Sequence, residues 1–153
     1  MSLQQIVKQQ YRALVNKASQ QTASLNIPNE GWIATVRKAL GMSGAQLARR
    51  RGISRAQVSK LEKTELDGSV TIGTMQKMAE AMECRFVYAI VPKDEIEEVI
   101  DAQAQKKARK LVSKAGQHMA LEAQSLSNEQ MRYEVERIAQ ELKARPPKDF
   151  WDE

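Results

Sequence analysis

The sequence is poor in the residues on which metalloenzymes, secreted proteins and membrane proteins depend. It holds one cysteine, Cys84, so an internal disulfide is excluded, which suits a reducing cytoplasm. It also holds one histidine, His118, and neither residue has a partner at metal-ligand or catalytic-triad spacing. We find no glycine-rich phosphate loop, no apolar run of membrane-spanning length and no signal-peptide pattern. We therefore expect a cytoplasmic protein that is not an enzyme and needs no cofactor, metal or membrane.

Glycine, proline and aromatic residues are scarce as well, with 7 Gly, 4 Pro and 5% aromatics in 153 residues. Gln, Lys, Arg, Glu, Ala and Met dominate instead, and these are good helix formers. A chain of this length accommodates one domain with extensions. The composition therefore predicts a mainly α protein. We interpret Cys84 as a small buried hydrophobe and His118 as a surface residue.

Positive charge is concentrated in one block of the chain. Residues 31–63 hold eight basic residues and one acid, a charge of 8 − 1 = +7, whereas the whole chain carries +5 and the remainder therefore −2. The basic residues are Arg37, Lys38, Arg49, Arg50, Arg51, Arg55, Lys60 and Lys63. Such a block is typical of a nucleic-acid interface, and a solvated helix face is the alternative.

Apolar spacing predicts the helices outside this block. Helices are expected over 2–19, with one apolar face, over 29–40, with Ala39 and Leu40 on the buried side, and over 94–124. Thr71 is expected to cap a helix over 72–82 whose inward side includes Ile72, and Ser127 to open a last helix ending near Ala144. The tail that follows carries two aromatics, Phe150 and Trp151, which we expect to be exposed.

Two short helices joined by a tight turn are predicted within the basic block. Ser43-Gly-Ala-Gln46 and Ser54-Arg-Ala-Gln57 both have the Ser-x-x-Gln form of a capping box. Gly52, between them, suits the left-handed conformation that ends a helix. Ala48 is small enough for the two helices to cross closely. Four apolar residues are expected to fill their shared core, namely Leu47, Ile53, Val58 and Leu61.

One short segment has the composition of a strand rather than a helix. It consists of Arg85, Phe86, Val87, Tyr88, Ala89, Ile90 and Val91, and Pro92 ends it. A single strand leaves its backbone groups unpaired, so we expect it to pair with the same strand of a second copy in a homodimer. The alternative is an extended segment packed on its own domain.

The spacing of these features resembles a known domain. Leu47-Ala48, Gly52-Ile53-Ser54 and Val58-Ser59-Lys60-Leu61-Glu62 resemble the lambda-repressor-like, Cro/C1-type (Xre-like) helix-turn-helix domain over residues 30–82. The resemblance implies DNA binding, with the second helix in the major groove; the alternative is a helix-turn-helix used only for protein contacts. The expected organisation is an N-terminal helix and linker (1–27), the DNA-binding domain with its dimerisation strand (28–92) and a helical C-terminal extension (93–153).

The resemblance also assigns DNA-binding roles to single residues. The first exposed positions of the second helix are expected to face base edges, and they are Ser54, Arg55, Ala56, Ser59 and Lys60. Arg55 is the leading candidate to read a guanine, although a plain phosphate contact is open. The candidates for phosphate contacts are Ser43, Gln46, Arg49, Arg50, Arg51 and Lys63, although one of the three consecutive arginines must face away from DNA. Many relatives carry Gln at the position of Gly44, so one side-chain clamp is missing.

A second resemblance spans most of the chain. Gly31-Trp-Ile33, Ala39-Leu-Gly-Met42, Gln46-Leu-Ala48, the run from Glu80 to Pro92, Met119-Ala-Leu-Glu-Ala-Gln124 and Phe150-Trp-Asp152 are similar to the mobile mystery protein A family. That resemblance implies an autoregulating antitoxin of a module with a neighbouring Fic-domain protein, acting as a repressor on a palindromic operator in double-stranded DNA.

The alternative function is a protein-binding inhibitor that neutralises its partner directly through the terminal helices. Some Fic inhibitors carry Ser or Thr four residues before Glu, and Ser125-x-x-x-Glu129-Gln130 approaches this pattern but ends differently. We prefer to interpret that stretch as a helix start capped by Ser127.

Overall fold

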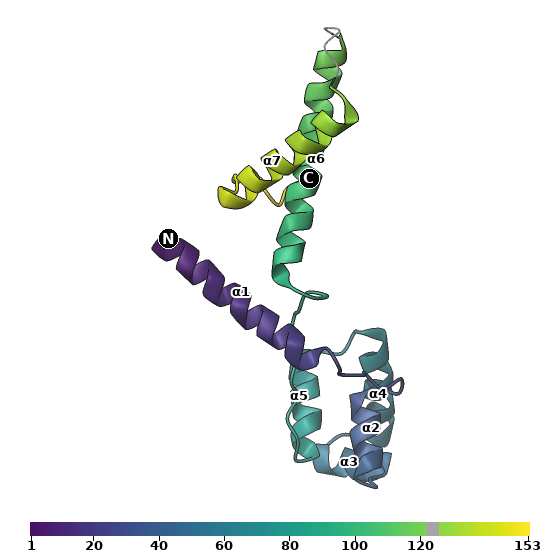
Figure 1. Cartoon of the computed structure of the whole chain (residues 1–153). Coiled ribbons are helices and arrows are strands. Elements are labelled where there is room, and N and C mark those ends of the chain that lie inside the picture. Colours follow the sequence, from purple (N-terminus) through teal and green to yellow (C-terminus); the bar gives the residue numbers. More distant parts are fainter. Residues whose placement is uncertain (122–125) are drawn as a thin grey trace. The chain divides into compact units, whose positions relative to one another are not determined.

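The chain folds into seven helices over the residues that the structure describes. The computed structural model describes residues 1–121 and 126–153, and it contains α1 (Leu3–Thr22), α2 (Trp32–Ala39), α3 (Gly44–Arg51), α4 (Arg55–Asp67), α5 (Ile72–Ala81), α6 (Ile96–Leu121) and α7 (Asn128–Ala144) (Figure 1). Residues 24–89 form one compact unit, which contains α2–α5. Residues 1–23 and 90–153 form the other unit, which contains α1, α6 and α7. The prediction of a mainly helical protein is confirmed.

The helix starts follow the predicted caps. Ser43, Ser54 and Ser127 each accept a hydrogen bond from the backbone N–H three residues later, and the Gln at that position returns one to the serine N–H. Thr71 caps α5 through the backbone N–H of Thr74. These caps satisfy N–H groups that a helix leaves without internal partners, so the chain is committed locally to starting its helices there. α2 begins at Trp32, later than the predicted 29, because Gly31 has φ +85°, which no α-helical residue adopts.

The 24–89 unit has a small core shared by its four helices. Its buried members are Ile33, Leu47, Ala48, Val58, Met75, Met78 and Met82, with Ile53, Leu61, Trp32 and Phe86 packed at the edge. Leu47 and Val58 come from the two helices of the predicted pair, and both are almost fully buried. The predicted core of the helix pair is therefore confirmed. Burial of these side chains contributes about 1.5–3 kcal/mol each, which holds α3 and α4 in a fixed crossing.

No strand is found in residues 1–121 and 126–153, so the strand predicted over Arg85–Val91 is not confirmed. The segment follows a sharp turn at Glu83, which has φ +57°, and then has no regular secondary structure. A strand needs a hydrogen-bonded neighbour, and none of the described residues provides one. Phe86 alone is half-buried against the core, and its ring stacks on Tyr88 at a centroid distance of 5.9 Å.

The second unit is built on the packing of α6 against α7 (Figure 1). Ala104, Ala108 and Ala139 are fully buried in the seam, and such small side chains let two helix backbones approach closely. Phe150 covers the end of this seam and is only 3% exposed, so its predicted exposure is wrong. The tail after α7 folds back, and Gln103 fixes it by donating to the Phe150 carbonyl at 2.7 Å. Trp151 is exposed, as expected.

α1 joins this unit through its polar side. Asn16 donates to the Glu97 carboxylate and accepts from the Ile96 backbone N–H, both at 2.8 Å, at the start of α6. Ser19, the buried polar residue of α1, donates to the carbonyls of Pro92 and Asp94 at 3.2 and 3.0 Å. α1 is therefore attached to this unit by polar hydrogen bonds. Leu3, Tyr11 and Leu14, which belong to its predicted apolar face, are exposed.

Further predictions about burial and helix bounds differ from the structure. Cys84 is exposed rather than buried, because the chain turns at Glu83 immediately after α5. Ile72, Ala39 and Leu40 are exposed because each lies at a helix end, beyond the reach of the core. α6 begins at Ile96, and residues 122–124 of the predicted helix lie outside the described residues, as does Ser125. In the described part of the chain, no helix combines the length and apolarity that crossing a membrane requires.

Candidate nucleic-acid interface

The turn between α3 and α4 has the geometry that the spacing predicted. Gly52 ends α3 in the left-handed region at φ +77°, where a side chain would be strained. The backbone N–H groups of Gly52 and Ile53 both donate to the Ala48 carbonyl, at 2.8 and 3.0 Å. Ala48 itself is buried between the two helices. The turn is therefore fixed on both sides of Gly52, and α4 starts two residues later at its own cap, Ser54.

The predicted base-reading residues share one exposed surface at the start of α4. Arg55, Ala56, Ser59 and Lys60 are all exposed, and Val58, between them, points into the core. Ser54 uses its hydroxyl oxygen to accept from the Gln57 N–H at 3.1 Å, which leaves its hydroxyl proton available for another acceptor. Among the described residues no ion pair engages Arg55 or Lys60. Both cations are thus free to meet an external anion.

Gly44 and Arg55 lie next to one another across the two helices. A Cβ built on Gly44 would stand 4.0 Å from Cγ of Arg55, an ordinary van der Waals distance. The position therefore accepts a side chain without a clash. Glycine is not required at this position for steric reasons. Its effect is that the position lacks a side chain that could bind DNA.

The residues predicted to contact phosphates differ in their environments. Ser43 and Gln46 are exposed at the start of α3, and each is engaged in the reciprocal cap at 3.1 and 2.8 Å. Arg49 and Lys63 are exposed, and Arg51 is half-buried. Arg50 has a different environment, because its Nε donates to the Ala81 carbonyl at 2.6 Å and its Nη2 pairs with Glu83 at 3.1 Å. Two of its five N–H donors are therefore engaged within the chain, and these two bonds direct its side chain toward the end of α5.

Arg37 belongs to the interior of the unit rather than to the basic surface. Its Nε pairs with Glu62 at 2.8 Å, its Nη1 donates to the Met42 carbonyl at 3.1 Å, and both side chains of the pair are mostly buried. The pair joins α2 to α4. Lys38 pairs with Glu30 at the surface. The acid at the end of the Val58–Glu62 motif therefore has a structural partner, and only part of the +7 block faces solvent.

Glu65 holds the start of α2, which sequence patterns did not indicate. Its carboxylate accepts from the backbone N–H groups of Trp32 and Ile33, at 2.5 and 2.9 Å. Gly31 has φ +85°, and a Cβ there would lie 2.9 Å from the same carboxylate. The residues are more than thirty positions apart, so no local motif links them. The available signal was negative: α2 has a glycine where a capping side chain is usual.

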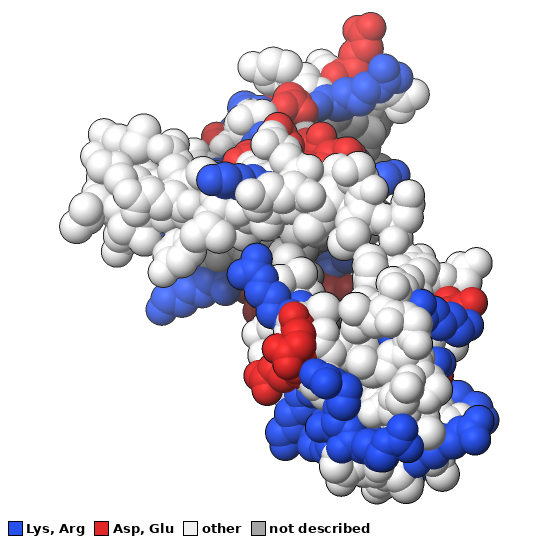
Figure 2. Space-filling view, turned by 90° about the horizontal axis from the view of Figure 1, so that it is seen from below, with Lys and Arg blue, Asp and Glu red and all other residues white. Residues whose placement is uncertain are grey.

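Several basic side chains of this unit are seen together on one of its faces. Figure 2 shows Lys and Arg in a band over the unit that contains α3 and α4, with white surface beside it.

The acid at the end of α4, Asp67, is held by Ser69, whose hydroxyl and backbone N–H donate to it at 2.5 and 2.9 Å and lower the pKa of its carboxyl. No group of three or more potential metal-ligating side chains is found in the parts of the chain that the structure describes.

This arrangement of capped helices around a glycine turn defines a helix-turn-helix unit. Residues 33–88 match the family model HTH_3, described as helix-turn-helix. The match runs from α2 through the segment after α5, so these residues form a helix-turn-helix domain and indicate a DNA-binding regulator of transcription. No curated protein and no solved structure matches the chain.

Proposed function

We propose that the protein is a sequence-specific DNA-binding repressor of transcription. The observation that carries the proposal is the surface at the start of α4, where Arg55, Ala56, Ser59 and Lys60 are exposed on a helix whose other side is fixed in the core. In helix-turn-helix proteins the second helix enters the major groove, and its N-terminal residues contact base edges. α4 is this second helix here.

Arg55 is assigned to a guanine, because its guanidinium can donate two parallel hydrogen bonds to O6 and N7. The Ala56 methyl suits a thymine methyl, and Ser54, Ser59 and Lys60 complete the base-reading surface. Phosphate contacts are assigned to Ser43, Gln46, Arg49, Arg51 and Lys63, which surround this surface in the same helix pair. Arg50 is left out of this set because its side chain is already bonded to the Ala81 carbonyl at the end of α5 and to Glu83.

A homodimer on a palindromic operator completes the proposal. A single helix-turn-helix contacts few base pairs, and two copies related by a two-fold axis read two half-sites one helical turn apart. The segment Arg85–Val91 is the proposed contact between copies. Its side chains of Val87, Tyr88 and Ile90 are exposed, Ile90 to 95%, and its backbone has no ladder partner in the described residues. Pairing with a second copy would cover these apolar side chains and provide hydrogen-bond partners for the backbone.

The proposed biological setting is a two-gene module in which the protein acts as the autoregulating antitoxin of a Fic-domain protein. This part of the proposal depends on the resemblance of the sequence to the mobile mystery protein A family. A direct observation that tests it is the identity of the neighbouring gene, and a neighbour without a Fic domain would contradict the assignment.

The DNA-binding proposal is tested by selecting a binding site from a random duplex library and measuring affinity for it across a range of salt concentrations. We expect a palindromic site and an affinity that falls steeply with salt, because phosphate contacts release counterions. Arg55→Ala should reduce discrimination at one base pair by about 1–3 kcal/mol. Lys77→Ala, an exposed cation on α5, is the control and should leave discrimination unchanged. An equal loss of affinity for all sequences would assign Arg55 to a phosphate contact. Failure to select any binding site would refute the proposal.

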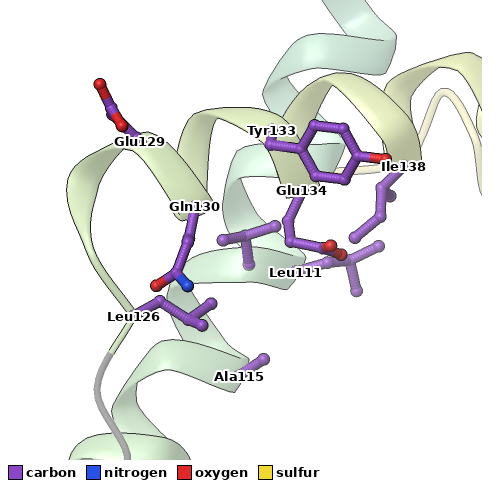
Figure 3. Close-up of a pocket in the computed structure, with 9 residues that line it drawn as sticks. Leu111, Ala115, Leu126, Glu129, Gln130, Tyr133, Glu134 and Ile138 are labelled. Atoms are coloured by element: carbon purple, nitrogen blue, oxygen red, sulfur yellow. The ribbon is translucent and has the colours of Figure 1, made fainter.

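Inhibition of a partner protein through the terminal helices is the second candidate function, and two apolar surfaces favour it. One runs along α1, where Leu3, Tyr11 and Leu14 are 67–77% exposed. The other is a groove of about 680 Å³ between α6 and α7 (Figure 3). Leu111 and Ala115 line it from α6, and Tyr133 and Ile138 face them from α7. Contiguous exposed apolar surface is a feature of many protein-binding sites.

The two candidates separate in a mixture without DNA. If the terminal helices inhibit, the purified protein should abolish the activity of the Fic-domain partner, and Leu14→Glu or Tyr133→Lys should restore that activity. Gln9→Glu, on the opposite face of α1 from Val7 and Leu14, is the matched control. Partner activity that persists in the presence of excess wild-type protein would exclude this candidate.

A further inference from the structure

A second concentration of positive charge lies on α6, outside the helix-turn-helix unit. Residues 102–121 contain five basic residues, namely Lys106, Lys107, Arg109, Lys110 and Lys114, and no acid. The start of the same helix is acidic, with Glu97 and Glu98 in its first turn. Over these twenty residues the charge is therefore +5, a density slightly above that of the block at 31–63, which carries +7 over 33 residues.

The packing of α6 sorts these charges onto one face. Ala104, Ala108 and Val112 are buried toward α7, and they recur every four residues. Lys106, Lys110 and Lys114 recur with the same spacing, half a turn away, and are exposed. At 1.5 Å per residue they span about 12 Å along the helix. Arg109, Ser113 and Gln117 lie beside them, and all three are exposed hydrogen-bond donors.

The chain neutralises only one end of this row. Lys107 pairs with Asp149 at 3.7 Å, and Lys106 pairs with Glu153 at 3.5 Å. The second pair is exposed on both sides and so contributes little. Within residues 1–121 and 126–153, no ion pair engages Arg109, Lys110 or Lys114. Three adjacent cations thus remain without a counter-charge.

The helix dipole does not account for their position. Cations are stabilised by the C-terminal end of a helix, but the effect is confined to the last turn. α6 continues to Leu121, so Lys114 lies about two turns before the end and Lys106 about four. The row also makes no contribution to the core of the unit, because its side chains point away from α7. A single-sign charged face of this kind is the electrostatic footprint expected of a surface that binds a polyanion.

We propose that Arg109, Lys110 and Lys114, with Lys106 at their edge, form a second contact with DNA phosphates; this inference rests on the proposed DNA-binding function. Duplex DNA carries one negative charge per about 1.7 Å of axis, so a row of about 12 Å faces several phosphates. Ser113 and Gln117 supply neutral donors of the kind that also bind phosphate oxygens. The face holds no aromatic residue and reads no sequence. Its role is to add affinity on DNA that flanks the operator.

The test uses the full-length chain with the substitutions R109Q/K110Q/K114Q. Affinity is measured against salt on two duplexes, one of about 20 base pairs that holds two half-sites one helical turn apart, and one with about 20 further base pairs on each side. On the long duplex we expect the slope of log affinity against log salt to decrease by about 5, since three contacts are lost from each of the two protomers and each contact contributes about 0.9. Affinity should fall by about tenfold or more, with the preference for the operator unchanged.

The matched control is K8Q/K17Q/K93Q, which removes the same charge from exposed positions of the same unit. The control should leave the slope on the long duplex unchanged. A smaller variant, K110Q/K114Q, should reproduce about two thirds of the effect, and circular dichroism should show the same helix content in every variant.

An unchanged slope in the triple variant, or an equal decrease in the control, would overturn the inference. Both outcomes leave the proposed function intact if Arg55→Ala still alters discrimination. Failure of the wild-type protein to bind either duplex would instead refute the proposed function itself.

Discussion

Replacement of Glu65 by alanine removes the carboxylate that accepts hydrogen bonds from the Trp32 and Ile33 backbone N–H groups, at 2.5 and 2.9 Å. A hydrogen bond to a charged group contributes about 1.5–3 kcal/mol, and the lower end applies because Glu65 is half-buried. We expect E65A to lower the free energy of unfolding by about 2–3 kcal/mol. In a unit as small as residues 24–89, this corresponds to a fall of about 10–20 °C in melting temperature.

Gly31 makes this prediction more specific. In Gly31→Ala the new Cβ would lie 2.9 Å from the Glu65 carboxylate, and φ +85° is a region that side chains rarely adopt. G31A should therefore cost about 1–3 kcal/mol of backbone strain together with part of the Glu65 cap. In the E65A background no carboxylate remains to be displaced. The double variant should then be less destabilised than the sum of the two single variants, by about 1–2 kcal/mol.

The measurement is urea unfolding followed by Trp32 fluorescence in a Trp151→Phe background, in which Trp32 is the only tryptophan. Trp32 lies at the start of α2, so its signal reports this unit. Glu80→Ala, an exposed acid on α5, is the control and should change stability by less than about 0.5 kcal/mol. Additive effects of G31A and E65A would refute the reasoning, because the structure places both residues in one contact.

Three further predictions concern the packing and the charges of the two units. Arg37→Met should destabilise the helix-turn-helix unit by about 1–3 kcal/mol in urea unfolding, because it leaves the mostly buried Glu62 carboxylate unpaired. The double variant R37M/E62M should recover most of this loss, and a double variant as unstable as R37M would contradict the ion pair. Phe150→Ala should cost about 3–4 kcal/mol because Phe150 is buried in the α6–α7 seam, whereas the exposed Trp151→Ala should cost less than about 1 kcal/mol; similar losses would contradict the fold of the tail. The Ser69 hydroxyl and N–H lower the pKa of Asp67 in the folded chain, so the stabilising contribution of this carboxylate is complete above its ordinary pKa and disappears as pH falls through the lowered value. Ser69→Ala should raise the pKa of Asp67 toward its ordinary value in an NMR titration, and an unchanged pKa would assign the shift to another cause.

Features encoded within a few residues were predictable from the sequence. The caps at Ser43, Ser54, Thr71 and Ser127 need only a hydroxyl and a backbone N–H three residues later, and all four form. The turn at Gly52 likewise depends on the conformation of one residue. Because these signals define the helix-turn-helix pair, the candidate site could be located from the sequence without knowledge of the fold.

Features that depend on distant parts of the chain were not predictable in the same way. Glu65 caps a helix more than thirty residues away, and the tail reaches α6 to bury Phe150. Arg50 looks like its neighbours Arg49 and Arg51 in sequence, and only the nearby Ala81 carbonyl distinguishes it. The segment Arg85–Val91 has the composition of a strand, but its pairing depends on a second chain, which composition does not describe.

The hydrogen bonds of Ser19 and Asn16 have a consequence for how the molecule is assembled. They join α1 to residues 92–97, across more than seventy positions of sequence, so the whole helix-turn-helix domain is an insertion within the other unit. During synthesis α1 emerges first, yet the groups that hold it appear only after residues 24–89 have left the ribosome. The core residues of the inserted domain all lie within that stretch, so it can fold before the chain of the other unit is complete.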